Sequence, residues 1–324
     1  MAQTTRTQIP AEVNNFYDRT LLDRALPVMP HALFGQRRAL PKGAGSNVIK
    51  FRRYGSLTAA TTALTEGTAP TGSQASVTDI TATALQYGDF VSFSDIVSDQ
   101  SIDPVLTEMS QVLGEQMGDT NDQLARNILA AGTTIQYAAG RVSRVTVAST
   151  DKLVIDEFDK ALRTLGNAKA KRITEFGGVS TGVGTVPVRD CYVAIISEYA
   201  AYDVRKITEF QSVETYAPNV GNLLPNEIGK IRNVRIIATT NAKVFTGAGA
   251  SGIDVHACLI LGANAYGVVD LGNSQASAGV IYKPLGSAGT ADPLNQNQTL
   301  GWKEYFVTKI LNDAYMVRIE HAVS

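Results

Sequence analysis

The segment from Asp103 to Gly132 constrains the fold most, because it predicts one long helix. Asp103 is a favourable N-cap residue, and Pro104 suits the first helical position, where a missing N–H costs nothing. Gly132 supplies the helix stop. At about 1.5 Å per residue, the helix would be on the order of 40 Å long, roughly the width of a domain. Its apolar residues recur at the helical period and are interrupted once, by a threonine: Leu106, Met109, Leu113, Met117, Thr120, Leu124 and Ile128.

The opposite face of this helix is acidic. It carries Glu108, Glu115, Asp119 and Asp122 against the single basic residue Arg126. A rod with one apolar face and one acidic face can form a spine that is covered by its own domain on the apolar side. We therefore expect a basic surface to lie against the four carboxylates.

Charge is distributed unevenly along the 324 residues, a length that suggests two domains. Residues 1–60 contain nine Lys or Arg and three acidic residues, so this segment is +6 and the remaining residues are −7. Such asymmetry fits either a nucleic-acid-binding arm or a basic end that lies on the acidic body of the next copy. The first reading calls for a denser basic cluster with aromatic stacking partners, so the sequence favours self-association.

Targeting and redox features point to an intracellular protein without disulfides. The chain has no run of eighteen apolar residues and its N-terminus lacks the apolar core of a signal peptide, so we expect no membrane contact and a cytoplasmic origin. Cys191 and Cys258 are the two cysteines, and we expect both to be small buried thiols.

The N-terminal third is predicted to consist of protruding segments. Residues 1–46 are interrupted by four prolines and form an arm with one short helix at Asn15–Leu26. Residues 47–101 form an extended hairpin, with strand regions at Asn47–Tyr54 and Ser76–Ile96 around a turn-rich loop. An isolated hairpin is marginal in water, so this one needs a partner surface. From Tyr54 to Ile102 there is no Lys or Arg.

The remainder mixes a few helices with many strands, without regular βα alternation, which indicates an α+β fold. A second amphipathic helix is expected at Asp151–Ala168, and Ser197 is expected to cap a third that runs to about Ile207. Gly177–Pro187 has the composition of a flexible loop. Strands are expected at Arg141–Ala148, Tyr192–Ile196, Lys230–Thr239, Cys258–Leu261 and Tyr266–Val269, and then along the alternating C-terminal tail to Ile319.

Candidate chemistry is weak throughout the sequence. Gly247 to Gly252 matches the GxGxxG dinucleotide pattern, but a strand-like run follows it, so the helix N-terminus that would hold a phosphate is missing. His256 and Cys258 would share one face of a strand, but two ligands alone make a poor metal site. The sequence therefore predicts no catalytic, cofactor-binding or metal-binding residue, no cofactor and no enzyme.

Short motifs run through the chain in a specific order, strongest over residues 16–132 and intermittent beyond. The motifs are Tyr17-Asp-Arg-x-Leu-Leu-x-Arg-Ala, His31-Ala-x-Phe34-Gly35-Gln36, Phe51-Arg52-Arg53-Tyr54, Leu64-Thr65-Glu66-Gly67, Asp103-Pro104-Val-Leu-Thr-Glu108, Leu113-Gly114-Glu115-Gln116, and more loosely Gly301-Trp302-Lys303 and Ile310-Leu311-Asn312-Asp313. Together with the order of arm, hairpin, spine helix, compact α/β region and strand-rich tail, these motifs resemble the major capsid proteins of tailed bacteriophages, which have the Hong Kong 97-type fold.

The resemblance implies an α+β capsid fold in which each segment has a place. Residues 1–46 would be the N-terminal arm along the shell, and residues 47–101 the E-loop that extends over the peripheral domain of a neighbouring subunit. Residues 102–150 would be the peripheral domain with its spine helix. Residues 151–254 would be the axial (A) domain around five- and six-fold axes, and residues 255–324 would complete both domains.

The resemblance also implies partners. The chain would assemble with copies of itself, as hexamers and pentamers, into the icosahedral shell of the virion in the host cytoplasm, around double-stranded DNA bound non-specifically. Portal and scaffolding proteins, and a cement or decoration protein, would be further partners. No lysine lies in residues 54–102, so a covalent hairpin cross-link of the kind some such shells have is not expected. Expected subunit contacts are Arg37, Arg38, Lys42, Arg52, Arg53, Glu66, Glu108, Glu115, Asp119 and Asp122.

Two other functions stay open at the level of sequence. An encapsulin-like compartment of bacteria would have the same fold but would hold an enzyme as cargo. A nucleotide-binding enzyme that uses the turn at Gly247–Gly252 is a more remote alternative.

Overall fold

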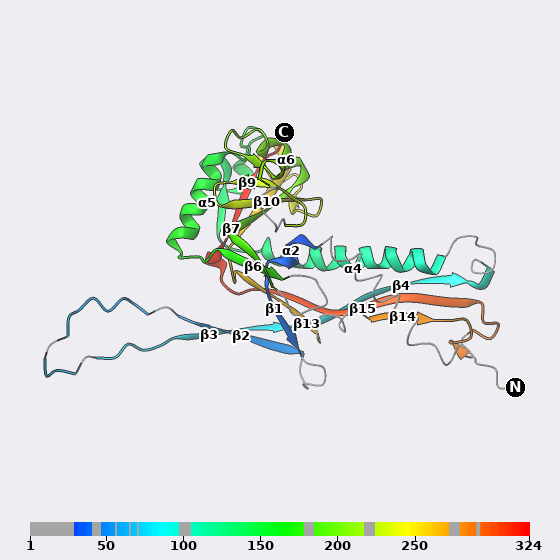
Figure 1. Ribbon diagram of the computed structural model, residues 1–324. Helices are drawn as coiled ribbons and strands as arrows, with labels where there is room; N and C mark the ends of the chain where they lie inside the picture. Colours follow the sequence, from blue (N-terminus) through cyan, green and yellow to red (C-terminus); the bar gives the residue numbers. More distant parts are fainter. Residues whose placement is uncertain are drawn as a thin grey trace.

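The computed structural model describes residues 29–40, 47–55, 57–64, 66–69, 71–96, 105–177, 185–216, 224–271, 279–289 and 292–324. The expected arm helix at Asn15–Leu26, the helix start at Asp103 and Pro104, and Lys42 lie outside these residues. Two bodies and a long hairpin make up the described chain (Figure 1). No helix in the described ranges combines the length and apolar composition that a membrane crossing requires.

The first body, here called the nine-stranded body, is built on a mixed sheet in the order β5-β16-β12-β7-β10-β9-β8. β11 and β6 are added beside β12 and β7, respectively. The parallel neighbours β7 and β10 are both buried over the paired segment, as expected of central strands. The strands are β5 Ile135–Tyr137, β6 Ile173–Gly177, β7 Thr185–Ser197, β8 Gln211–Ser212, β9 Glu227–Ile231, β10 Val234–Thr239, β11 Val244–Phe245, β12 Val255–Leu261 and β16 Met316–His321.

Helices α5 (Ile155–Asn167), α6 (Glu198–Val204) and α7 (Val213–Tyr216) belong to the same body. The apolar stripe of α5 buries Phe158, Ala161 and Leu165 against the sheet, which confirms the predicted second amphipathic helix. The Ser197 hydroxyl accepts a hydrogen bond from the Ala200 N–H and caps α6, also as predicted.

The second body, here called the α4 body, places α4 (Val105–Leu129) along a five-stranded sheet. β15 (Asn297–Ile310) is its central strand and pairs with β4 (Leu85–Ser94) on one side. On its other side β15 pairs with β14 (Gly279–Lys283) and β13 (Tyr266–Leu271), and β1 (Gln36–Leu40) follows β13 in parallel. α4 runs along this sheet (Figure 1), and the even-numbered side chains Leu300 and Trp302 of β15 pack against Leu113 and Met117 of the helix.

The buried face of α4 lies partly off the predicted stripe. Leu113 and Met117 are buried as expected, but Ile128 is exposed and Asp122, expected on the outer face, is fully buried. The prediction that Asp122 lies on the outer, acidic face of the helix is therefore wrong. Polar residues can occupy the buried face because they find buried partners, as Asn121 does when its amide donates to Glu304 Oε2 at 2.7 Å.

The hairpin is shorter than expected. β2 (Val48–Tyr54) pairs with β3 (Val77–Thr83) in a separate two-stranded sheet, but the predicted strand region Ser76–Ile96 breaks at the buried Ala84. The second half is β4, which pairs with β15 over ten residues instead. Val91 and Phe93 thereby reach the cluster beneath α4, which gives β4 more apolar burial than a hairpin could.

Three further expectations needed correction. Arg141–Ala148 is a compact loop that follows a 3₁₀ turn at Ala138–Gly140 and contains another at Arg144–Thr146. It does not extend into a strand because Arg141 pairs with Asp151 and Arg144 with Glu320. Lys230–Thr239 contains parts of two strands, joined by a turn in which Arg232 has a φ of +53°. The predicted loop at Gly177–Pro187 is shorter, because Thr185 to Pro187 already belong to β7.

Short elements complete the described chain. α2 spans Pro30–Leu33, and 3₁₀ turns span Ala250–Gly252 and Asp313–Tyr315. The last of these separates β15 from β16.

Candidate subunit-contact surfaces

The hairpin projects away from both bodies (Figure 1). In its loop, residues 57–64, 66–69 and 71–76 are all exposed, and the exposed fraction of Leu64 reaches 78%. Glu66 is exposed, and no atom lies within 4 Å of the position a Cβ would take on Gly67. The loop therefore presents apolar and acidic side chains to solvent rather than to its own chain.

The base of the hairpin is anchored on the five-stranded sheet. Phe51 and Ala82 pack with Val269 in a small buried cluster. A Cβ on Gly267 would approach the Phe51 ring to 2.7 Å, so the bare backbone of this glycine makes room for the ring. Arg53 adds a hydrogen bond from Nη1 to the Leu311 carbonyl oxygen, at 3.4 Å.

Arg52 already has a partner within the hairpin. Its guanidinium donates from Nε to Asp79 Oδ1 at 2.9 Å and from Nη2 to Oδ2 at 3.2 Å, across the β2–β3 pair. This hydrogen bonding lowers the pKa of Asp79 and raises that of Arg52. Both side chains are solvent-exposed, so the pair aligns the strands more than it stabilises the fold.

The four acidic residues of α4 have different environments. Glu108 is exposed and Glu115 half-buried. Asp119 is half-buried and accepts hydrogen bonds from Asn241 Nδ2 at 2.6 Å and from Gln123 Nε2 at 2.7 Å. Asp119 thus links α4 to the chain that follows β10.

Asp122 forms a buried pair with His31 instead of facing solvent. Its Oδ1 accepts from the His31 N–H and its Oδ2 contacts His31 Nδ1, both at 2.8 Å. The Tyr266 hydroxyl completes the cluster, because it donates to the His31 carbonyl oxygen and accepts from the Phe34 N–H. The sequence reading missed this pair; the small residues Gly114, Gly118 and Ala125, spaced along the same face as Asp122, were the available signal.

Of the other basic candidates, Arg37 is half-buried and Arg38 exposed on β1. Their strand lies beside β13, two strands away from β15. The structure therefore does not gather the nine described candidate residues into one site: it spreads them over the hairpin, β1 and α4.

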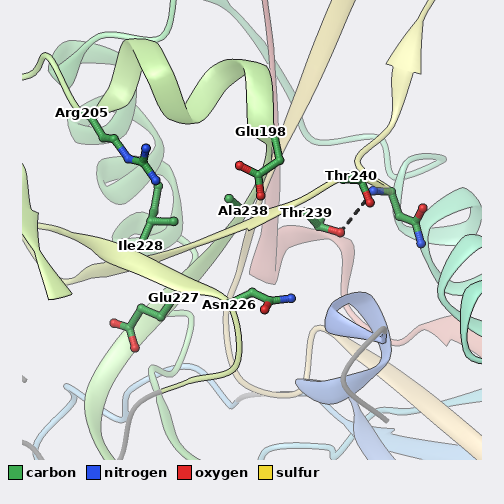
Figure 2. Close-up of a pocket in the computed structure, with 9 residues that line it drawn as sticks. Glu198, Arg205, Asn226, Glu227, Ile228, Ala238, Thr239 and Thr240 are labelled. Carbon is green, nitrogen blue, oxygen red and sulfur yellow. Dashed lines mark hydrogen bonds between the residues drawn. The ribbon is translucent and has the colours of Figure 1, made fainter. Parts of the chain in front are cut away.

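A polar cleft of about 410 Å³ opens in the nine-stranded body (Figure 2). It lies at the carboxyl ends of the parallel strands β7 and β10, where Glu198 and Thr239 lie close to Asn226. Glu227 in its wall is held by Arg235 through Nε at 2.7 Å. Within the described residues, no group of three or more possible metal ligands forms, so the cleft does not have the composition of a metal centre.

The turn at Gly247–Gly252 does not lead into a helix. Its 3₁₀ turn is followed by β12, as the sequence indicated, so no helix N-terminus points at the glycines. The nearby Cys258 is buried, and burial raises the pKa of its thiol; the pKa of the Cys191 thiol is likewise raised, to about 11. Buried thiols of this kind are poor nucleophiles and metal ligands.

Comparison with known proteins gives one consistent picture. Residues 77–319 match the family model described as phage capsid protein. No curated protein matches the sequence.

Solved structures share the fold at low sequence identity. The capsid of Ralstonia phage GP4 is 13% identical, with a TM-score of 0.71 over 90% of this chain and 87% of that one. The head of Helicobacter pylori bacteriophage KHP40 is 13% identical, with a TM-score of 0.63 over the same shares of the two chains. The capsid of cyanophage Pam1 is 11% identical, with a TM-score of 0.61 over 92% of each chain.

Proposed function

Because this chain belongs to the family of phage capsid proteins and is a structural subunit of a capsid shell rather than an enzyme, we propose that its hairpin joins neighbouring subunits. The α+β Hong Kong 97-type fold implied by the sequence motifs is confirmed. Because the family consists of structural proteins and not of enzymes, the alternative of a nucleotide-binding enzyme is excluded.

The observation that carries the proposal is the exposure of the hairpin loop. Between β2 and β3, all the described loop residues are exposed, and they include Leu57 and Leu64. Hydration of exposed leucine side chains is unfavourable, so burying them against a partner surface would lower the free energy. In a shell of identical subunits, the surface of another copy is always available.

Electrostatic attraction supports the same arrangement. Glu66 and the exposed part of the α4 acidic face, Glu108 and Glu115, face basic candidates of a neighbour in this proposal. Those candidates are Arg37, Arg38, Lys42 and Arg53; Arg52 contributes less because Asp79 already occupies it. Each exposed pair is worth about 0–1 kcal/mol, but the contacts repeat in every subunit of the shell.

The finer partners are part of the proposal. The shell is built of hexamers and pentamers and encloses the double-stranded DNA of a tailed phage, assembled in the host cytoplasm with a portal protein and a separate scaffolding protein. No lysine is present in residues 54–102, so the hairpin contact is noncovalent, and a cement protein is a natural reinforcement. The axial position belongs to the nine-stranded body, and the peripheral position to the α4 body.

Shortening the loop tests the proposal. A variant in which residues 57–74 are replaced by a short Gly-Ser turn keeps β2, β3 and the Phe51 anchor, so the subunit folds. We expect electron microscopy to show folded subunits or small oligomers but no closed shells. Shells of normal size from this variant would overturn the proposal. In shells of the intact chain, encapsulated DNA supports the phage role, whereas an enzyme cargo would favour the encapsulin-like alternative.

A further inference from the structure

Residues 29–34, which contain α2 and are here called the wedge segment, lie where the nine-stranded body meets the α4 body (Figure 1). Every residue of the segment is buried. Its apolar side chains belong to one cluster that also contains residues of β7, β10 and β12 from the first body and of α4, β13 and β15 from the second. The wedge segment therefore fills the joint between the two bodies.

Buried polar contacts hold the wedge segment in one position. Towards α4, the His31 N–H donates to Asp122 Oδ1 and His31 Nδ1 contacts Asp122 Oδ2, both at 2.8 Å. Towards β13, the Tyr266 hydroxyl donates to the His31 carbonyl oxygen at 2.6 Å and accepts from the Phe34 N–H at 3.2 Å. Polar groups left unpaired in the interior are costly, so the segment cannot shift without a loss of stability.

The chain leaves the wedge segment through a glycine that lies against β13. A Cβ on Gly35 would approach Tyr266 Cε2 to 2.6 Å and Val268 Cγ2 to 2.7 Å, so a larger residue would force the segment away from the strand. From Gln36 the chain continues as β1, which pairs in parallel with β13. The wedge segment is thus anchored to the α4 body, while its apolar side chains share their cluster with the nine-stranded body.

Hydrogen bonds between the two bodies occur near the C-terminal half of α4. Arg318 of β16 donates from Nη1 to the Gly132 carbonyl oxygen at 3.2 Å. The Asn241 carbonyl oxygen accepts from Arg126 Nη1 at 3.0 Å, and Asn241 Nδ2 donates to Asp119 Oδ1 at 2.6 Å. Hydrogen bonds tolerate moderate changes in angle, whereas a close-packed apolar interior does not. The packing of the wedge segment is therefore the stricter constraint on how the bodies are oriented.

We infer that the wedge segment sets the angle between the nine-stranded body and the α4 body, and that this angle sets the curvature of the shell. When neighbours bind to both bodies, a change of angle inside one subunit recurs in every identical subunit and alters how the assembly closes. The second part of the inference rests on the proposed function. The first part concerns the single subunit and is measured there.

Distances between the two bodies test the first part in the unassembled subunit. Spin labels are attached at Val112→Cys on α4 and at Val142→Cys on the nine-stranded body, since these valines are 50% and 86% exposed. Cys191 and Cys258 are buried and stay unlabelled. Pulsed electron paramagnetic resonance should give one narrow distance distribution for the labelled chain. Leu33→Ala should broaden or displace that distribution, because it leaves a cavity in the joint.

Two further variants make this measurement decisive. Leu165→Ala is the matched control, because Leu165 is fully buried in the nine-stranded body but outside the cluster at the joint, so the distances should not change. Tyr266→Phe removes the hydroxyl that holds the wedge segment but keeps the ring, and it should displace the distribution even if Leu33→Ala does not fold. An unchanged distribution in Leu33→Ala, or in Tyr266→Phe where Leu33→Ala does not fold, overturns the inference. An equal change in the control also overturns it.

Electron microscopy of assembled shells tests the second part. Tyr266→Phe leaves the hairpin intact, so closed shells should form, but with diameters that are shifted or more widely spread than those of the original chain. Leu165→Ala shells should keep the original diameter. Shells of the original diameter from Tyr266→Phe subunits with altered distances, or no closed shells at all, would overturn the link to curvature.

The shortened hairpin loop separates this inference from the proposed function. Normal shells from the loop-shortened variant overturn the role of the hairpin, whereas the distances within the unassembled subunit decide the role of the wedge segment independently.

Discussion

At the scale of single residues, Asp122 and His31 show how much can depend on one buried pair. Both carboxylate oxygens of Asp122 contact His31, and both residues are inaccessible to solvent. The pair ties α2, in the first described segment, to the C-terminal half of α4. Removing one partner leaves the other buried without its complement, which costs far more than the pair itself contributes.

We expect Asp122→Ala to lower the free energy of unfolding of the unassembled subunit by about 3 kcal/mol, because His31 loses both hydrogen-bond acceptors. Urea denaturation followed by circular dichroism measures the change. Glu108→Ala, on the same helix but exposed, is the control and should change stability by less than about 0.5 kcal/mol. Equal effects from the two substitutions would show that the contact between Asp122 and His31 does not stabilise the subunit.

A second pair of buried residues makes the nine-stranded body sensitive to acid. His256 and His321 lie directly opposite each other on β12 and β16, with ring centroids 6.3 Å apart. Burial lowers the pKa of His256, and burial lowers the pKa of His321 to about 4. Asp203 near His321 and Asp254 near His256 oppose these shifts but do not cancel them.

Stability should therefore fall as the pH is lowered from about 6.5 to about 4, because the unfolded chain takes up protons on these histidines before the folded one does. For His321 alone, the loss amounts to about 3 kcal/mol across that window. Urea denaturation at a series of pH values measures it. His321→Gln should flatten the profile, and a profile as steep as that of the original chain would contradict this assignment.

The residue scale is also where the sequence was least informative. Which acidic residue of α4 is buried depends on where His31 lies, 91 positions away in the chain. Helical periodicity places Asp122 on the face opposite the apolar stripe, and only the tertiary partner accounts for its burial. Glu108 lies on that same predicted face and is exposed, as expected.

At the scale of elements, α4 depends on a few large side chains. Leu113 and Met117 fill the space above Leu300 and Trp302, and the Trp302 indole N–H donates to Gln116 Oε1 at 3.1 Å. Leu129, at the C-terminal end of α4, is also fully buried and packs with residues of both sheets. The other fully buried residues of the helix are small or polar.

Leu113→Asp should abolish the soluble folded subunit, because it buries an unpaired charge where a side chain 2% exposed now lies. Soluble yield and circular dichroism of the purified chain give the readout. Val112→Asp is the matched control, since Val112, which precedes Leu113 in the sequence, is 50% exposed and should tolerate the charge. A stable, soluble Leu113→Asp subunit would show that this contact does not hold α4 on the sheet.

Elements with local signals could be predicted, and those with distant partners could not. The helices α4 and α5 and the Ser197 cap follow from spacing and capping within a short segment. β4 reads like the continuation of β3, yet it pairs with β15 more than 200 residues later in the chain. The gain in burial that draws β4 away from the hairpin exists only once α4 and β15 have come together.

At the scale of the whole molecule, charge separation governs association. The described loop of the hairpin and the outer side of α4 are acidic, whereas the open face of the five-stranded sheet carries Lys283, Lys303 and Lys309. Contacts between copies that combine these surfaces are screened by salt.

We expect the subunit concentration needed for assembly to rise as sodium chloride is increased from about 0.05 M to about 0.5 M, as the screening length shortens. Light scattering of purified subunits follows shell formation. The charge-neutral variant Glu66→Gln should show a weaker salt dependence than the original chain. Assembly that strengthens steadily with salt would instead point to contacts dominated by apolar burial.

The small anchor of the hairpin has a mechanical consequence. Phe51, Ala82 and Val269 form a small packed cluster over the backbone of Gly267, and the strands and loop of the hairpin extend from this cluster. The hairpin from Phe51 to its tip has some thirteen residues and spans at most on the order of 40 Å. A rotation of about 10° about the cluster would therefore displace the tip by roughly 7 Å. One unchanged chain could thus meet neighbours set at different angles, as a closed surface with both flat and curved regions demands.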